Sequence, residues 1–518
     1  MRLLSTITSG AVYGIRSCMI QVEVDVSPGL PCFQMVGLPG SAVREARERV
    51  KVALKNVGVK IPPMCINVNL SPADLPKSGT MFDLPVAVGI MTALSLIPKE
   101  AIEDTLLLGE LGLSGELKPV RGVLPILQES VKQGIKRCIL PTENVWEGRL
   151  VEAIESVGAA GLNEAIAYLM GKDVSEDKKS RETTAVFDTA TLQSCKDDRL
   201  DFADINGQEG IKRAAEVAAA GFHHLLMIGP PGSGKTMLAR RIPTILPPLS
   251  REESLEVSAI YSISGLLQQT HSLTTIRPYQ SPHHTITGQA LAGSGRIPTP
   301  GIISLAHRGV LFLDELTEFK RETLDILRQP LEDKQIQIAR SSGTYVYPAD
   351  FILVGALNPC PCGYYPDRNK CCCTSNEIRR YLGKISGPIL DRMDICVEAQ
   401  IMDFQDIAVP REAERSAVIR ERVIAAREVQ KVRFAGTKLC FNGEMGAGEV
   451  EKYCRLGEKE RKFMEKVYQN LQLSARGYHK ILKVARTIAD LAGSEQIREI
   501  HLSEAVCYRQ INQKYRFG

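Results

Sequence analysis

Residues 229–236 read Gly-Pro-Pro-Gly-Ser-Gly-Lys-Thr, the pattern of a loop that binds nucleotide phosphates. An apolar strand is predicted immediately before this loop, at 225–228, and a helical pattern follows it. Glycine lets backbone N–H groups face a phosphate without a Cβ in the way, and the amino end of a helix adds partial positive charge. We therefore expect Lys235 to reach the β- and γ-phosphates and Thr236 to ligate Mg²⁺. The predicted nucleotide-binding residues of this segment are Gly229, Pro230, Pro231, Gly232, Ser233, Gly234, Lys235, Thr236 and Met237.

Two other segments end in polar residues after an apolar strand. Residues 309–313 lead to Asp314, which suits the Mg²⁺ shell, and to Glu315, which suits a base that orients the attacking water. Asp314 therefore joins the predicted nucleotide-binding set. The strand 351–357 ends in Asn358, which we expect to position the same water if the strands are parallel neighbours. An asparagine at such a place also commonly begins a turn.

A cluster of cysteines follows Asn358. Five of the 14 cysteines lie between 360 and 373, in the pattern C-x-C, eight residues, C-C-C. They offer four thiolates to one tetrahedral site across a Gly-Tyr-Tyr-Pro turn, and zinc is the metal expected there. Reduced loop thiols and a redox disulfide are the alternatives.

The positions of these motifs predict an α/β protein with several domains. Residues 1–171 alternate short apolar strands with helical patterns, as in a compact α+β domain. Residues 172–200 are polar and without apolar period, which predicts a linker. Residues 201–400 form a second α/β block that holds the motifs, and residues 401–518 show long helical periodicity.

Composition excludes several classes of protein. The 518 residues are 44% hydrophobic and 24% charged, which is a globular composition. The sequence contains neither an apolar run long enough to span a membrane nor a signal-peptide pattern, so we expect a cytoplasmic protein without a membrane partner. The net charge is only +4, but residues 411–518 carry 22 Lys and Arg against 14 Asp and Glu. This excess permits a polyanionic partner, and a solvated basic face is the alternative.

The order of the motifs, continued by Leu390-Asp-Arg-Met-Asp and Ser474-Ala-Arg-Gly, resembles the ComM/YifB family of Mg-chelatase-like AAA+ ATPases over nearly the whole chain. The resemblance implies a P-loop AAA+ core, a parallel sheet with flanking helices, followed by a helical lid. It also implies a homo-hexamer that binds ATP and Mg²⁺ between subunits. Arg392 matches the arginine finger, for which a salt bridge to Asp391 or Asp394 is the alternative. Arg476 matches the sensor-2 arginine of the lid, acting on its own or on the neighbouring subunit's nucleotide. The catalytic residues expected are Lys235, Glu315, Asn358, Arg392 and Arg476.

The same resemblance implies an insert at 265–295 and a hairpin at 335–347 that both point into the ring channel, where Arg340 could touch a phosphate backbone. It also favours Cys360, Cys362, Cys371 and Cys373 as the zinc ligands, because relatives usually show C-x-C in the second half. Cys372 departs from that pattern.

Three segments of the N-terminal domain are characteristic: Pro76-Lys-Ser-Gly-Thr-Met-Phe-Asp-Leu-Pro, Arg121-Gly-Val-Leu-Pro, and Lys132-Gln-Gly-Ile-Lys-Arg-Cys-Ile-Leu-Pro-Thr-Glu-Asn. By these segments the domain resembles the Lon-type peptidase domain, an α+β, S5-like fold. Placing the sequence on that pattern puts Met81 at the position of the serine nucleophile and Leu124 near that of the lysine base. Neither side chain can attack a peptide bond, so we expect no proteolysis. Lys77 and Ser78 are the residual candidates, but adjacent residues rarely face each other.

The resemblance therefore predicts an ATP-driven hexameric DNA motor, a branch-migration translocase or helicase of recombination or natural transformation that acts on branched or single-stranded DNA. The alternative is a chelatase-like AAA+ chaperone that remodels a protein partner.

Overall fold

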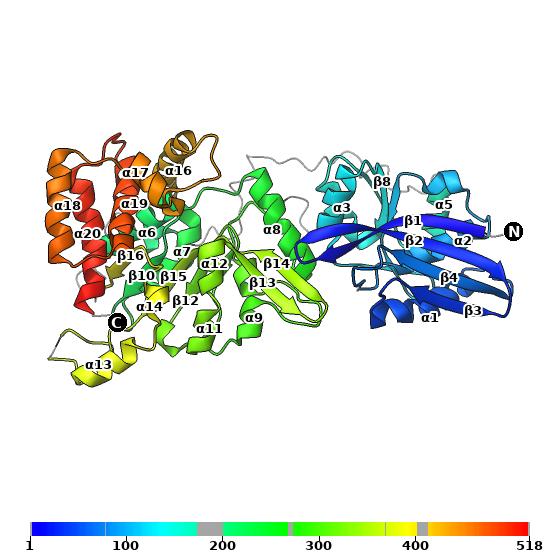
Figure 1. Cartoon of the computed structure of the whole chain (residues 1–518), viewed down its shortest axis with the longest axis horizontal. Helices are drawn as coiled ribbons and strands as arrows, with labels where there is room; N and C mark the ends of the chain where they lie inside the picture. The colour runs from blue at the N-terminus through cyan, green and yellow to red at the C-terminus, as the bar shows by residue number, and fades with distance from the viewer. Residues whose placement is uncertain are drawn as a thin grey trace.

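The computed structural model describes residues 3–77, 79–172, 200–267, 273–367, 369–400 and 413–515. Most of the predicted linker, and Ser78, lie outside these ranges. Figure 1 shows the N-terminal α+β part at one end, the C-terminal helices at the other, and the second α/β part between them. Within the described residues, no helix combines the length and the apolar character that crossing a membrane requires.

A seven-stranded sheet, in the order β3-β4-β2-β1-β5-β8-β9, forms the N-terminal part. In β2, every second residue from Ile20 to Val26 is buried, so one face of the strand packs on the core. Helix α2 is apolar on all sides and wholly buried against this sheet. The strands are β1 Leu3–Tyr13, β2 Arg16–Pro28, β3 Cys32–Val36, β4 Met64–Ser71, β5 Thr105–Leu107, β8 Arg137–Pro141 and β9 Glu155–Ala159, with the small ribbon β6 Glu110–Leu111 and β7 Leu117–Lys118. The helices are α1 Ser41–Asn56, α2 Asp83–Ala93, α3 Val123–Lys132, α4 Val145–Arg149 and α5 Leu162–Leu169.

One disulfide joins Cys32 to Cys65, which are direct partners on the parallel strands β3 and β4. The structure shows no second disulfide among the described cysteines. The sequence analysis did not anticipate this pair, because only strand pairing brings together residues that are 33 apart in the chain.

Five parallel strands in the order β11-β12-β15-β10-β16 form the central sheet. Strands β10, β12 and β15 are apolar and buried throughout, as expected for a sheet covered on both faces. Because the strands are parallel, all their carboxyl ends lie at one edge of the sheet. The strands are β10 Leu225–Ile228, β11 Tyr279–Gln280, β12 Val310–Leu313, β15 Ile352–Leu357 and β16 Ile395–Glu398, and the separate hairpin is β13 Gln335–Arg340 and β14 Gly343–Pro348. The helices are α6 Glu209–Gly221, α7 Lys235–Ile245, α8 Arg251–Ser264, α9 Gly288–Ala292, α10 Ile302–Leu305, α11 Arg321–Asp325, α12 Arg328–Asp333, α13 Ser375–Leu382 and α14 Gly387–Leu390.

The C-terminal helices share one continuous apolar core with the central sheet. Helix α16 packs on α6 and α7, and α20 packs on α19 and β16. The Ser474 side chain accepts a hydrogen bond from the Gly477 backbone N–H and so caps the amino end of α19. The helices are α16 Ser416–Arg433, α17 Ala447–Tyr453, α18 Glu458–Asn470, α19 Ala475–Leu491 and α20 Glu499–Lys514.

The β13–β14 hairpin contacts the N-terminal part instead of projecting freely. The Ile15 N–H donates to the Val346 carbonyl at 3.2 Å, and the Tyr13 and Tyr345 ring centroids are 4.5 Å apart. A cavity of about 910 Å³ beside this contact is lined by residues of both parts, among them Arg16 and Arg308. The hairpin forms as the sequence predicts, but in this chain it packs against the turn between β1 and β2.

Candidate nucleotide site and cysteine cluster

The P-loop connects the buried end of β10 to the first turn of α7. Gly232 and Gly234 have φ of 76° and 83°, in the left-handed region that glycine adopts without strain. The chain can therefore turn sharply enough to direct its N–H groups inward at the amino end of α7. The residues from Gly229 to Met237 lie together here, as the motif predicts.

Lys235 is buried at the centre of this loop. Its Nζ donates to the Gly229 and Pro230 carbonyls at 2.7 and 2.8 Å and lies 3.4 Å from Asn358 Oδ1. Burial lowers the pKa of Lys235 to about 8, and the carboxylate of Asp314 opposes that shift. A phosphate bound in the loop would supply negative charge beside the buried Lys235 ammonium and so stabilise its charged form.

Thr236 and Asp314 meet at the carboxyl edge of the sheet. The Thr236 hydroxyl donates to Asp314 Oδ2 at 2.7 Å. A hydroxyl and a carboxylate oxygen side by side beside a phosphate loop fit Mg²⁺, which prefers oxygen ligands. Glu315 follows with φ of 49°, and its N–H donates to Asp314 Oδ1 at 3.0 Å. A non-glycine residue with this φ is strained, and backbone strain of this kind clusters at functional sites.

His284 is a site residue that the sequence analysis did not single out, because it lies within the insert expected at 265–295. Its Nδ1 lies 3.5 Å from Glu315 Oε2, and its ring packs against those of His283 and Phe319. Because β11 is parallel to β12, residues that follow β11 emerge at the same edge as Glu315. His284 lies four residues beyond the end of β11, so no local pattern in the sequence pointed to it.

Arg392 lies at the opposite edge of the sheet, just before β16. It pairs with Glu332 and donates to the Pro388 carbonyl at 3.0 Å. Burial lowers the pKa of Arg392, and the positive charges of Arg476 and Arg328 lower it further. Arg476 itself is exposed in the first turn of α19.

The turn that carries Arg392 is anchored to α19 through Asp394. Lys480 Nζ lies 3.0 Å from Asp394 Oδ1, and His223 Nδ1 lies 3.5 Å from Oδ2. Burial would raise the pKa of Asp394, but Lys480 and His223 lower it well below its ordinary value. Asp394 is thus engaged by Lys480 and His223, and the salt bridge that Arg392 makes is to Glu332.

The structure brings Lys235, Thr236, Asp314, Glu315 and Asn358 together at the carboxyl edge. It places Arg392 and Arg476 together at the amino edge. Parallel strands cannot bring the two edges of one sheet into contact, so a single chain carries two separate halves of the predicted catalytic set.

The four favoured cysteines converge after β15. The sulfur atoms of Cys360, Cys362, Cys371 and Cys373 all lie within 4.8 Å of one another, whereas Cys372 is exposed. The Cys360–Cys362, Cys360–Cys371 and Cys362–Cys371 sulfur distances are 3.3, 3.8 and 3.6 Å. Four thiolates at the usual Zn–S length lie about 3.8 Å apart at the corners of a tetrahedron, so the set fits zinc. The Tyr364 backbone N–H is the main cause that lowers the pKa of Cys362 to about 6.

The positions of the peptidase dyad are occupied by core residues. Met81 is 7% exposed and Leu124 is 0% exposed. Lys77 is also buried, and its ammonium donates to the Pro72 carbonyl. The positions of the peptidase serine and lysine, Met81 and Leu124, thus pack apolar side chains into the interior.

A five-stranded parallel sheet with this strand order, a P-loop after β10 and an acidic pair after β12 define a P-loop protein of the AAA+ class. Known proteins match it along most of its length. Family models for magnesium chelatase subunit ChlI match residues 201–407 and 22–144, and a model for its C-terminal part matches residues 413–509. The uncharacterized protein YifB of Escherichia coli strain K12 is 42% identical over 512 residues, which cover 98% of this chain and 97% of YifB. Competence protein ComM of Haemophilus influenzae strain Rd is 41% identical over 507 residues, with the same shares covered.

The chain belongs to the ComM/YifB family of Mg-chelatase-like AAA+ proteins. A partial similarity extends to Lon protease 2 of Bacillus subtilis, which is 26% identical over 187 residues, or 32% of this chain and 33% of that protease.

Proposed function

We propose that this protein hydrolyses ATP between neighbouring copies of itself, in a homo-hexameric ring, and uses the energy to move along DNA in the cytoplasm. The observation that carries the proposal is the division of the catalytic set between the two edges of the central sheet. A P-loop edge from one copy facing the arginine edge of the next completes the set. Repeating that contact around a rotation axis generates a ring.

Each half has a defined task in this arrangement. Lys235 and the loop N–H groups bind the β- and γ-phosphates, while Glu315 and Asn358 orient the attacking water. Thr236 and Asp314 would hold Mg²⁺, which neutralises charge on the phosphates. Arg392 of the neighbouring copy stabilises charge that develops on the transferred phosphoryl group, and Arg476 adds a second positive charge beside it.

His284 is positioned to hold the Glu315 carboxylate aside when nucleotide is absent. Its imidazole lies beside the Glu315 carboxylate and is part of the ring group formed with His283 and Phe319. Binding of nucleotide would compete for the same carboxylate through the attacking water.

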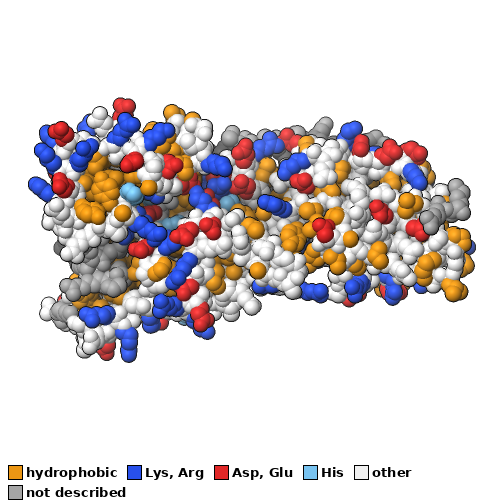
Figure 2. Space-filling view, in the orientation of Figure 1, with side chains coloured by type: hydrophobic (Ala, Val, Ile, Leu, Met, Phe, Trp, Pro, Cys, Tyr) orange, Lys and Arg blue, Asp and Glu red, His pale blue; other side chains and the backbone are white. Residues whose placement is uncertain are grey.

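DNA as the partner is supported by the charge of the C-terminal segment and by the relative named a competence protein. In Figure 2, Lys and Arg side chains gather over the C-terminal helices, interspersed with acidic ones. Phosphate contacts of this kind release counterions, so binding should weaken steeply as salt concentration rises. We propose branch migration during recombination or natural transformation as the activity.

The test is phosphate release and strand exchange on a synthetic four-way junction, with and without ATP. We expect forked DNA to stimulate ATP turnover and ATP to drive strand exchange. Glu315→Gln should keep ATP binding and lose turnover, because an amide cannot accept the water's proton. Turnover at the wild-type rate in this variant would remove the role assigned to Glu315. Turnover that ignores DNA would favour a chelatase-like chaperone acting on a protein partner.

We further propose that Cys360, Cys362, Cys371 and Cys373 bind one Zn²⁺ per chain. Elemental analysis of the purified protein should give one zinc per chain, retained in Cys372→Ser and lost in Cys371→Ser. Far less than one zinc in the wild-type protein would overturn the assignment.

A further inference from the structure

We infer that the four-cysteine site controls nucleotide affinity, because it holds the loop that supports the P-loop. The inference rests on the proposed nucleotide binding and adds a means of regulating it. Three contacts connect the cysteine site to the elements around the phosphates.

The first contact is direct. Gly363 follows the ligand Cys362, has φ of 87°, and donates its N–H to Cys360 Sγ at 3.2 Å. It lies so close to Pro231 that a Cβ at position 363 would overlap the proline ring. The cysteine loop therefore packs against the outer side of the P-loop, with no side chain between the two.

The second contact runs along the chain. Asn358, whose side-chain oxygen lies 3.4 Å from Lys235 Nζ, is two residues before Cys360. Cys360 is fully buried in the apolar core beneath β12 and β15. A metal bound to Cys360 thus fixes the backbone at the position from which Asn358 reaches the phosphate site.

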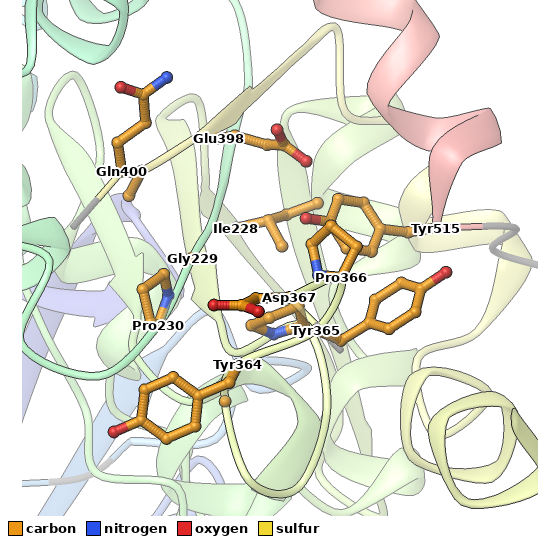
Figure 3. Close-up of a pocket in the computed structure, with 13 residues that line it drawn as sticks. Ile228, Gly229, Pro230, Tyr364, Tyr365, Pro366, Asp367, Glu398, Gln400 and Tyr515 are labelled. Carbon is orange, nitrogen blue, oxygen red and sulfur yellow. The ribbon is translucent and has the colours of Figure 1, made fainter. Parts of the chain in front are cut away.

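The third contact extends to the C-terminal helices. The Tyr365 ring lies 6.0 Å from that of Tyr515, edge to face, at the end of α20. Figure 3 shows residues 364–367 spanning from the P-loop residue Pro230 toward Tyr515. They line a cavity of about 430 Å³, together with Glu398 and Gln400 at the end of β16.

The cavity explains why the cysteines decide the position of this loop. Residues 358–374 contain neither helix nor strand in the part that the structure describes. The cavity lies against residues 363–367, whereas Cys360, Cys371 and Cys373 on either side of them are buried in the apolar core. A loop of this length has large conformational freedom unless something restrains it. Four bonds to one metal join its beginning to its end, so removing the metal frees the segment that abuts Pro231.

The experiment compares zinc-loaded full-length protein with protein stripped by a zinc-selective chelator, in excess Mg²⁺. The readout is the Kd for a fluorescent, non-hydrolysable ATP analogue, with zinc content measured on the same samples. We expect stripping to weaken binding about tenfold, within the usual range of coupling between two sites. Because such coupling is reciprocal, the analogue should tighten zinc binding by the same factor, measured by competition with a chromophoric chelator.

Two variants separate the loop contact from general loss of structure. Gly363→Ala keeps all four ligands but forces the loop away from Pro231, so it should retain one zinc and bind the analogue about tenfold more weakly. Cys372→Ser is the matched control, because Cys372 is an exposed neighbour outside the tetrad, and it should change neither quantity.

Equal affinity of loaded and stripped protein, or wild-type affinity of Gly363→Ala, would overturn the coupling while leaving the nucleotide site intact. If zinc-loaded protein did not bind the analogue at all, the proposed function itself would fail, and the coupling with it. Unchanged zinc affinity on adding the analogue would also overturn the coupling, because linkage requires both effects.

Discussion

The two edges of the central sheet are built from opposite kinds of residue. The carboxyl edge holds the P-loop, two acidic residues and Asn358, on strands that are fully buried. The amino edge holds Arg392 on the turn between α14 and β16, and Arg476 in the first turn of α19. From this difference we propose that one edge binds a charged ligand and that the other supplies charge to a ligand bound by a neighbouring copy. The predictions below test that division, in order of decreasing effect.

The largest effect is expected at Arg392. Arg392→Ala should lower the turnover number about 10³–10⁵-fold, because an arginine finger acts on transition-state charge, and should leave the Kd for ATP unchanged. Phosphate release and nucleotide binding measure the two quantities. The exposed Arg379→Ala variant in α13 is the control and should retain wild-type turnover.

Mixing variants tests whether the two edges act on one nucleotide. Lys235→Ala damages only the carboxyl edge, and Arg392→Ala damages only the amino edge. Each should be inactive alone, and mixed oligomers should regain part of the activity at interfaces that pair two intact edges. No recovery from a mixture shown to form mixed oligomers would contradict the shared site.

A smaller effect is expected at Arg476. Arg476→Ala should lower turnover about 10²-fold, comparable to the loss of one donor that stabilises transition-state charge. The same assays apply, and the double variant with Arg392→Ala should lose less than the product of the two single effects, since the two groups lie together. Independent, multiplicative losses would mean that the two arginines act at different places.

A pH effect should appear at the carboxyl edge alone. The pKa of Lys235 is lowered to about 8 in the free site, and phosphate binding should raise it, because the ligand is an anion. Affinity for the ATP analogue should therefore be greatest below pH 8 and fall as the pH rises above it. Calorimetry near pH 8 in two buffers of different ionisation enthalpy should detect proton uptake on binding. If the affinity for the ATP analogue did not change between pH 7 and 9.5, this assignment would be contradicted.

The smallest effect is expected where the N-terminal part meets the hairpin, which belongs to neither edge. Tyr13→Ala removes the ring pair with Tyr345, which we expect to contribute about 1 kcal/mol. Hydrogen exchange at the Ile15 amide should accelerate about fivefold, since local opening reflects that free energy. Turnover should stay unchanged, as it should in the control Tyr468→Ala on α18. A large loss of turnover in Tyr13→Ala but not in Tyr468→Ala would show that the hairpin contact affects the catalytic residues.

Much of the site could be predicted from short stretches of sequence, for a physical reason. A P-loop needs a strand, glycines, a lysine and a helix start in immediate succession, so its chemistry is encoded locally around Lys235. Asp314 and Asn358 follow from the same rule, because each ends an apolar run. The cysteine tetrad needed both spacing and resemblance, and the structure brings its sulfur atoms together without Cys372.

Other features depend on contacts between distant residues. His284 faces Glu315 only because β11 pairs with β12, and Cys32 meets Cys65 only because β3 pairs with β4. The hairpin at 335–347 was expected from the sequence, but its packing against Tyr13 depends on a surface more than 300 residues away in the chain.

The sequence by itself determined the phosphate loop and the acidic pair, because each is a matter of residue type at fixed local spacing. The cysteine set and the loss of the peptidase dyad also needed the family resemblance. The tertiary structure alone decided which of these groups meet. Because the five strands are parallel, all their carboxyl ends lie at one edge of the sheet, while Arg392 and Arg476 lie at the other. No local sequence pattern predicts that these two groups of residues are separated.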